Sequence, residues 1–257
     1  FINKYNNNFK IGGIKIFLDG SPQAKTAWLR EAYANEPEYY GYRIMKDEDV
    51  EEILENSKES NLQILAHCNG DKAAEQYINA IKNISGLKRP VMIHAQILGL
   101  DQLPDVKKYN IIPSFFISHI YYFGDIHIKN LGIKRAEHIS PAGSSLKHNI
   151  LFTFHQDTPV IEPDMFETIW CAVNRKTKEG KVLGENEKIS VLEAIKAVTI
   201  NVAYQYGEEN IKGSLKVGKN ANMIIINKNP LKIDKDEIKD IKILETIKDG
   251  KNIWKCQ

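Results

Sequence analysis

Five polar residues accompany short apolar runs in this chain, and each of them can bind a metal or move a proton: Lys15, His67, His94, His119 and Asp157. The runs that carry or precede them are rich in Ile, Val, Leu and Phe: GIKIF, LQILA, PVMI, IIPSFF and ILFTF. Continuous apolar runs of this length are typical of strands buried on both faces of a parallel sheet. Catalytic groups of β/α barrels collect at the carboxyl ends of such strands, so we expect these side chains at one end of the sheet.

These residue types favour metal-assisted hydrolysis. Imidazole nitrogens and carboxylate oxygens are the usual ligands of catalytic zinc, which keeps one position open for water and lowers its pKa to about 7. The resulting hydroxide can attack an amide or ester carbonyl. Asp157 would take the proton of the attacking water and pass it to the leaving amine, as a general base that becomes a general acid. His119 is placed to polarise the carbonyl or to hold the oxyanion.

Each assignment also has a structural alternative. A histidine that follows an apolar strand can be a satisfied structural residue, and Asp157 could cap the next turn. Lys15 could extend its ammonium into solvent. His119 could stack on Tyr121 or Tyr122. Two further groups complete the expectations: Cys68 should point into the core, and the remaining histidines of Lys- and Asn-rich connections should be exposed, namely His127, His138 and His148.

The segment 21–43, SPQAKTAWLREAYANEPEYYGYR, is long and aromatic for a connection. We expect Trp28 and Tyr40, together with Tyr39 and Tyr42, to form one wall of an apolar substrate pocket. Arg30 or Arg43 would be its polar anchor. Packing of the same side chains on the barrel rim is an equal alternative. His155 is a further candidate for substrate contact, although it could also support the ligands from behind or be inert.

The composition describes an ordinary globular chain. Its 257 residues are 42% apolar and 26% charged, enough for one barrel or two smaller domains. The formal net charge is +2, from 35 basic and 33 acidic residues without a basic stripe, so we expect no nucleic-acid partner. No apolar stretch reaches the roughly 20 residues that span a bilayer, and FINKYNNNFK does not resemble a signal peptide. Three dispersed cysteines suit a reducing compartment, so we expect the cytoplasm.

Helical patterns alternate with the strand candidates, which indicates repeated β-α units and a parallel sheet. Residues 47–60 and 71–84 carry apolar side chains at helical spacing. Ser190 and Glu193 form a Ser-x-x-Glu capping box at which a third helix should begin. After residue 211 the chain has one apolar strand and then ILETIKDGKNIW, which predicts a hairpin with Asp-Gly at its turn.

Taken in order, five pieces of the chain resemble the amidohydrolase superfamily: GIKIFLDGS, ILAHCNGDKA, VMIHAQ, HQDTPV and GSLKVGKNANMIIINKNPL. The resemblance is to the N-substituted formamide deformylase-like, metal-dependent hydrolases of amidohydrolase family 3. It implies a TIM-type β/α barrel over residues 1–210, a small β-sandwich that includes residues 211–257, and one or two divalent metals, usually zinc. It also implies that Lys15 is the carboxylated lysine of the fourth strand, that His67 and His94 are metal ligands, and that Asp157 is the ligand of the eighth strand.

One departure from the family pattern matters. The family's first strand supplies a His-x-His pair, and no His-x-His occurs among the seven histidines of this sequence. The chain also begins with Phe1, and its first strand resembles the fourth of the barrel. We therefore expect a carboxyl-terminal portion that holds strands four to eight of an incomplete barrel. A short paralogue that has lost its metal is the alternative.

Three functions follow from these expectations. The first is metal-dependent hydrolysis of carbon–nitrogen bonds in a small amide or formamide. The second is a catalytically inert fragment or paralogue, and the third is a nonhydrolytic ligand-binding protein on the same scaffold. An incomplete barrel would leave open strand edges and uncovered apolar surface, which favours pairing with another copy. We therefore also expect a homo-oligomer.

Overall fold

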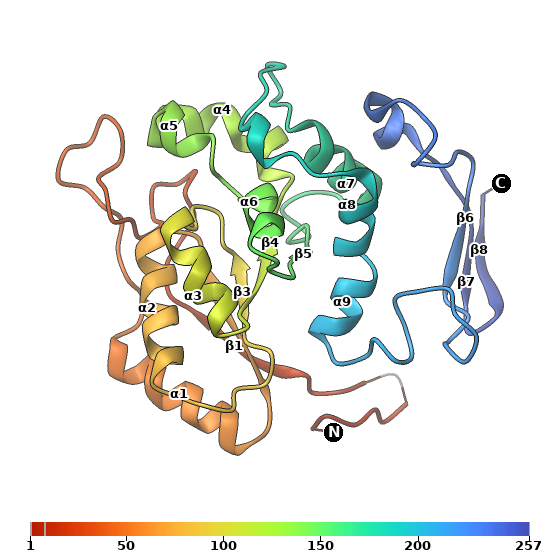
Figure 1. Ribbon diagram of the computed structural model, residues 1–257, viewed down its shortest axis with the longest axis horizontal. Helices are drawn as coiled ribbons and strands as arrows, with labels where there is room; N and C mark the ends of the chain where they lie inside the picture. Colours follow the sequence, from red (N-terminus) through yellow and green to blue (C-terminus); the bar gives the residue numbers. More distant parts are fainter. Residues whose placement is uncertain (1, 8, 257) are drawn as a thin grey trace.

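The computed structural model describes residues 2–7 and 9–256 and shows helices alternating with the strands of a parallel sheet (Figure 1). The strands are β1 (Gly13–Phe17), β2 (Gln63–Cys68), β3 (Val91–His94), β4 (Ile112–Phe115) and β5 (Thr153–Phe154). They lie in the sheet in sequence order, and every neighbouring pair is parallel. The predicted α/β class is therefore confirmed, and all five apolar runs contribute a strand.

Helices connect the strands and lie along the sheet: α1 (Asp47–Glu59), α2 (Asp71–Lys82), α3 (Leu103–Lys108), α4 (His119–Leu131), α5 (Ile133–Ala136), α6 (Ala142–Lys147), α7 (Met165–Asn174), α8 (Val191–Ala197) and α9 (Ile200–Gln205). The first two match the predicted helices to within two residues, because their apolar side chains recur at helical spacing. In α1, for example, Val50 and Leu54 are both fully buried. The third begins as predicted, since the hydroxyl of Ser190 accepts a hydrogen bond from the backbone N–H of Glu193 at 3.2 Å. Among the described residues, no helix combines the length and apolar character that crossing a bilayer requires.

The two faces of the parallel sheet have different surroundings. Ile16 of β1 and Ala66 of β2 are buried in the hydrophobic core. The alternate side chains of β1, Lys15 and Phe17, point to the other face, where Phe17 is 51% exposed. Phe17 is paired in register with His67, and their rings lie 5.3 Å apart between centroids. The candidate ligands of β1 and β2 therefore share the face that is not filled by the core.

A second, antiparallel sheet follows near the carboxyl terminus and contains β6 (Met223–Ile226), β7 (Ile243–Lys248) and β8 (Lys251–Lys255). The turn between β7 and β8 is the predicted Asp249-Gly250, and both residues have positive φ angles, as a type I′ hairpin turn requires. Figure 1 shows this sheet beside α7 and α8. A 3-10 helix, Lys235–Asp240, lies between β6 and β7 and packs against α7, and its Ile238 is buried. The domain boundary between residues 210 and 211, which would separate the partial barrel from the β-sandwich, stays a prediction.

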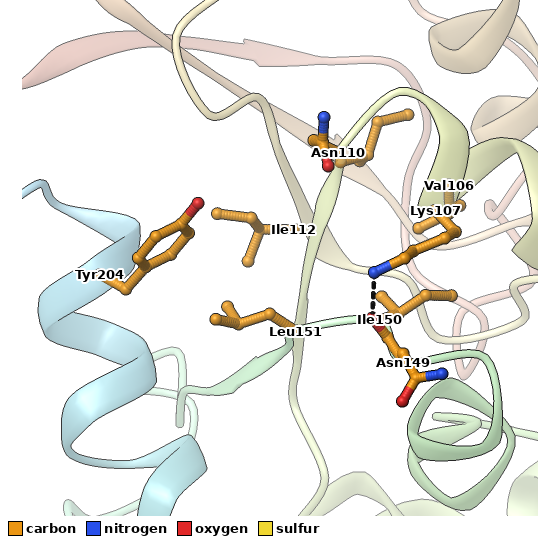
Figure 2. A pocket seen from close by; sticks show the side chains of 9 residues that line it. Val106, Lys107, Asn110, Ile112, Asn149, Ile150, Leu151 and Tyr204 are labelled. Carbon is orange, nitrogen blue, oxygen red and sulfur yellow. Dashed lines mark hydrogen bonds between the residues drawn. The ribbon is translucent and has the colours of Figure 1, made fainter.

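A small cavity of about 140 Å³ opens at the amino ends of the parallel strands (Figure 2). Ile112 at the start of β4, Ile150 and Leu151 before β5, and Tyr204 of α9 line it. None of the predicted site residues borders this cavity, because they gather at the opposite ends of the strands. We therefore assign it no part in the chemistry.

The structure corrects the prediction that His127 is exposed. His127 is completely buried, whereas His138 and His148 are exposed and Cys68 is buried as expected. The Lys and Asn residues around His127 indicated a solvent-exposed connection. In the structure this stretch belongs to α4, whose inward face carries Ile120, Gly124, His127 and Leu131. Helical spacing therefore places the histidine inside and the neighbouring lysine outside.

Arg175 fixes the end of α7 from within the core. Its side chain is 0% exposed, and its guanidinium donates to the carbonyl oxygens of Leu183 and Ile139 at 2.7 Å and of Ser140 at 3.2 Å. Burial lowers its pKa to about 10, so the group remains charged at neutral pH. The charge is thus solvated by three carbonyl dipoles that belong to two other segments.

Replacing Arg175 with Met should lower the free energy of unfolding by about 3 kcal/mol or more, because three buried carbonyl groups lose their donors. The measurement is urea unfolding followed by circular dichroism. Arg43→Met is the control, since Arg43 is exposed and its nearest carboxylate, that of Asp47, is 3.8 Å away. A change within about 0.5 kcal/mol is expected there. Equal effects of the two substitutions would contradict this role of Arg175.

Burial of His127 should make the fold sensitive to acid. Desolvation lowers its pKa from 6.5 to about 4, so the unfolded chain binds this proton at a higher pH than the folded chain does. The stability that depends on the neutral ring is therefore present above pH 6.5 and is lost as the pH falls through 4, with a full effect of about 3 kcal/mol. Unfolding of wild type and His127→Phe at pH 7 and pH 4 tests this. The variant should lose less stability between the two values, whereas His148→Phe should behave as wild type.

Candidate active site at the carboxyl ends of the parallel strands

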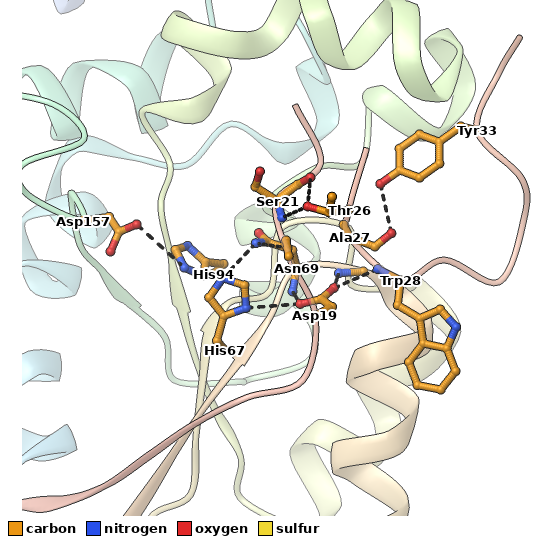
Figure 3. Close-up of polar contacts among 12 residues, drawn as sticks. Asp19, Ser21, Thr26, Ala27, Trp28, Tyr33, His67, Asn69, His94 and Asp157 are labelled. Carbon is orange, nitrogen blue, oxygen red and sulfur yellow. Dashed lines mark hydrogen bonds and ion pairs between the residues drawn. The ribbon is translucent and has the colours of Figure 1, made fainter. Parts of the chain in front are cut away.

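A buried carboxylate organises the ends of β1 and β2. Asp19 lies just after β1 and is 1% exposed. Its Oδ1 accepts from the backbone N–H of Asn69 at 2.9 Å and contacts Nδ1 of His67 at 3.2 Å (Figure 3). Its Oδ2 accepts from the backbone N–H groups of Gly70 at 2.7 Å and Trp28 at 3.0 Å. One side chain therefore joins the connection after β1, which contains Trp28, to residues 67–70 at the end of β2.

The contact with Asp19 also orients His67. A carboxylate can only accept a hydrogen bond, so the proton of a neutral His67 ring lies on Nδ1 and its Nε2 carries the lone pair. The amide nitrogen of Asn69 lies 3.3 Å from that Nε2. Metal-binding histidines usually donate their second ring N–H to a carboxylate or a carbonyl in this way. His67 is therefore held in the tautomer that a metal ligand needs.

His94 reaches the site because the backbone turns at the end of β3. The register pairs His94 with Cys68, whose side chain is buried in the core. Its φ angle of 72° lies in the left-handed region, which is uncommon for a residue other than glycine, and Ala95 follows at 46°. The ring of His94 lies 4.5 Å from that of His67, between centroids. Strained backbone of this kind occurs often at functional sites.

The imidazole of His94 is neutral and partly unpaired. Burial, followed by the neighbouring His155 and His67, lowers its pKa well below the ordinary value. Its Nδ1 is buried and has no hydrogen-bond partner. Its Nε2 lies 4.0 Å from Oδ2 of Asp157, a half-exposed side chain whose φ angle is also left-handed at 50° (Figure 3). A neutral ring beside a carboxylate retains a lone pair that can bind a cation.

Lys15 lies on the same side of the sheet. Its ammonium is 5.1 Å from the centroid of the Phe17 ring. Much of the side chain is exposed, yet partial desolvation lowers the pKa of the amine, and the charge of Asp157 acts in the opposite direction. The structure thus gathers the four predicted ligands, Lys15, His67, His94 and Asp157, at one end of the sheet.

The other predicted catalytic residue, His119, lies on the far side of an aromatic layer. His155 packs against His94 at 4.8 Å and against Phe116 at 5.5 Å, between ring centroids. His119 contacts Phe116 at 4.4 Å and is the first residue of α4 rather than the end of a strand. Desolvation lowers the pKa of His155 to about 3 and that of His119 well below its usual range. Both rings are therefore neutral at physiological pH.

The structure does not bring the predicted substrate wall to these histidines. Trp28 donates its backbone N–H to Asp19, but Figure 3 shows its indole pointing away from His67. Tyr40 is 42% exposed. Arg30 forms ion pairs with Glu75 at 2.9 Å and Asp101 at 2.7 Å, so the charge of its guanidinium is already balanced by two carboxylates. Backbone hydrogen bonds hold this segment against the beginning of α2 instead. The carbonyl of Trp28 accepts from the backbone of α2, and the N–H of Arg30 donates to the carboxylate of Asp71.

The donors at the site fit part of a metal centre. Within residues 2–7 and 9–256, no group of three or more His, Cys, Asp or Glu side chains converges closely enough to hold a metal ion. Two imidazoles and a carboxylate nevertheless lie near one another at this end of the sheet, and these are the donor types that zinc prefers. The unpartnered Nδ1 of His94 adds a buried polar atom that calls for a partner. His67, His94 and Asp157 are therefore the side chains suited to such an ion.

Sequence reasoning missed Asp19 and Asn69. Both had the same signal as the predicted ligands, since each follows the end of an apolar strand in FLDG and AHCNG. In a sequence, Asp-Gly and Asn-Gly are equally typical of turns, so this signal alone does not separate a site residue from a turn residue. The structure shows that the Asp19 carboxylate faces inward and is held by hydrogen bonds instead of facing solvent.

The sequence matches the amidohydrolase family over residues 2–253. A protein of Bacillus subtilis (strain 168) that is named as an amidohydrolase, YtcJ, is 26% identical over 254 residues, which are 95% of this chain and 47% of that protein. N-substituted formamide deformylase of Arthrobacter pascens is 30% identical over 116 residues, 44% of this chain and 21% of that enzyme.

The fold is similar to that of a solved structure described as an uncharacterized metal-dependent hydrolase from Pyrococcus horikoshii OT3. The TM-score is 0.81 and the sequence identity is 26%, over 91% of this chain and 48% of that chain. The chain thus spans about half the length of relatives such as YtcJ. Because the family match covers nearly every residue, the chain belongs to the amidohydrolase family.

Proposed function

We propose that the protein is a metal-dependent hydrolase of carbon–nitrogen bonds in small amides, and that this chain carries part of its site. The observation that carries the proposal is the contact between His67 and His94, whose ring centroids are 4.5 Å apart. Asp19 orients the first ring, and burial keeps the second one neutral. Two lone-pair nitrogens are thus held side by side at the end of a parallel sheet, where α/β enzymes collect their catalytic groups.

His67 and His94 would hold a divalent metal, for which zinc is the best match to imidazole donors, and Asp157 would complete their side of the site. Bound there, the metal would supply a Lewis acid and a water of lowered pKa. Asp157 takes the proton of the attacking water and returns it to the leaving amine. Its half-exposed carboxylate suits this transfer, because it can reach both partners. His119 donates to the carbonyl oxygen.

Lys15 is proposed as the carboxylated lysine of the site. Reaction with carbon dioxide requires a neutral amine, and desolvation shifts the pKa of this amine downward. The product would be an anion, which removes the repulsion between an ammonium and a metal ion. We retain His155 as a proposed substrate contact, because its ring packs against that of His94. Substrate binding by Trp28, Arg30 and Tyr40 stays a prediction.

We also propose that β1 to β5 are strands four to eight of a barrel. The side chains of β1 that would face a barrel interior, Lys15 and Phe17, are exposed, and β1 and β5 have no further strand beside them in the described sheet. The C-terminal sheet is similarly uncovered, with exposed apolar side chains at Ile224, Ile253 and Trp254. Such surfaces support self-association. The homo-oligomer and the cytoplasmic location stay predictions.

Metal binding by the chain itself tests the proposal. Zinc titration by calorimetry should give saturable binding that weakens at least tenfold in His67→Ala and in His94→Ala, because each substitution removes one ligand. His148→Ala is the control, since this histidine is exposed and far from the strand ends. Equal binding by all four proteins, or no zinc binding even by a form extended upstream to include a His-x-His strand, would count against the hydrolase and favour the inert or ligand-binding alternative.

Hydrolysis assays on small amides and N-substituted formamides should show a role for Asp157 in proton transfer. Asp157→Asn should lower kcat by about 10²–10⁴, because an amide cannot take up the proton of water. Asp105→Asn is the matched control, since Asp105 pairs with Lys82 on the outer helices at 2.8 Å. It should retain wild-type kcat. An active Asp157→Asn enzyme would remove this residue from the mechanism.

A further inference from the structure

Two histidine rings of α4 contact each other inside the protein. Nδ1 of His119 lies 3.2 Å from Nε2 of His127, and the rings are stacked with an interplanar angle of 9° and a centroid distance of 5.4 Å. The residues are eight positions apart, which corresponds to about 12 Å along a helix axis. The two side chains must therefore reach toward each other to meet. Helical side chains lean toward the amino terminus, which directs His127 toward His119.

Both rings are neutral at physiological pH. His127 is completely buried and His119 nearly so. Desolvation lowers the pKa of His127 to about 4 and moves the pKa of His119 well below its usual range. A neutral imidazole carries one proton on one of its two nitrogens. A single proton therefore lies between Nδ1 of His119 and Nε2 of His127, and it belongs to one ring or to the other.

The environment of the remaining nitrogen of His127 distinguishes the two cases. Its Nδ1 is buried and has no hydrogen-bond partner. If His119 were the donor, the proton of His127 would have to sit on that Nδ1, as a buried N–H without an acceptor. If His127 is the donor, the same Nδ1 is an unprotonated acceptor. Orphaned buried N–H groups are rarer in proteins than acceptors without a donor, so the second arrangement is favoured.

We propose that His127 is a positioning residue that donates its Nε2–H to Nδ1 of His119 and thereby fixes the proton of His119 on Nε2. Nε2 is then the nitrogen of His119 that remains for a substrate, and it presents a hydrogen-bond donor. A donor at this place suits a carbonyl oxygen that gains negative charge during acyl transfer. It excludes His119 in this tautomer as a metal ligand or a general base. The catalytic consequence rests on the proposed function, whereas the tautomer does not.

Nitrogen-15 NMR of the histidine-labelled chain without metal tests the tautomer directly. The two ring nitrogens of each histidine have distinct chemical shifts when protonated and when bare, and the signals of His119 and His127 are assigned by their loss in single Phe variants. Both residues should be protonated on Nε2, with a coupling across the shared hydrogen bond. A proton on Nδ1 of His119 would overturn the proposal.

Two variants of His127 separate positioning from packing. His127→Phe keeps an aromatic ring and has no donor, whereas His127→Gln retains an amide N–H that can serve Nδ1 of His119. In the active enzyme, His127→Phe should lower kcat about 10- to 100-fold with little change in KM, and His127→Gln should recover most of the loss. His148→Phe is the control for an exposed histidine. Thermal unfolding at neutral pH confirms that each variant is folded.

The outcomes separate the two proposals. Wild-type kcat in a folded His127→Phe protein, or an equal loss in the Gln and Phe variants, would overturn the positioning role. If a protein with the complete metal site hydrolyses none of the amides tested, the proposed function fails alone, because the NMR measurement on the metal-free protein still determines which ring donates. The expected tautomer in an inactive protein would then support the His119–His127 arrangement without the hydrolase.

Discussion

The hydrogen bonds accepted by Asp19 are the constraint on which the site depends. A buried carboxylate is costly unless its oxygens are satisfied. Here each oxygen has two donors, and the four donors come from Trp28 and from residues 67–70, which are far apart in sequence. The donors are the beginning of α2, the ring of His67 and the backbone of Trp28. The loops after β1 and β2 must therefore close around the carboxylate. This closure sets the orientation of His67, and His67 in turn forms the surface against which His94 packs.

Backbone strain then places the other donors. His94 and Asp157 both have positive φ angles at the ends of their strands, and such conformations cost of order 1–3 kcal/mol each in a non-glycine residue. Without this turn, the pairing of His94 with Cys68 would direct the imidazole toward the core. The core around β2 and β3 is apolar and buried, and the strands that end in these turns are anchored in it. The packing of the sheet thus supports a local arrangement that the strand ends would not adopt alone.

The site has two halves joined by aromatic contacts. One half holds Asp19, His67 and His94, with lone pairs and negative charge. The other half holds His119 and His127, for which we propose a proton donor directed at the substrate. His155 and Phe116 fill the space between them. The shared surroundings are largely dry, which keeps the buried histidines neutral and strengthens each hydrogen bond between them. Under the proposed function, a substrate carbonyl that reached both halves would meet the attacking water on one side and a hydrogen-bond donor on the other.

The sequence by itself determined the parallel strands, two of the helices and two local boundaries. Apolar runs specified β1 to β5, and helical spacing specified α1 and α2. The Ser190 cap specified the beginning of α8, and Asp249-Gly250 specified the hairpin turn. All of these features depend on near neighbours in the chain. It also predicted that Lys15, His67, His94 and Asp157 lie at one end of the sheet, because the carboxyl ends of parallel strands lie on the same side. Only the tertiary structure decided that Asp19 faces inward, that His127 is buried against His119, and that Arg30 is already paired with Glu75 and Asp101. The identity of a polar side chain does not determine its partner. That choice depends on donors and charges brought close by segments distant in sequence, and on how much water the assembled core excludes.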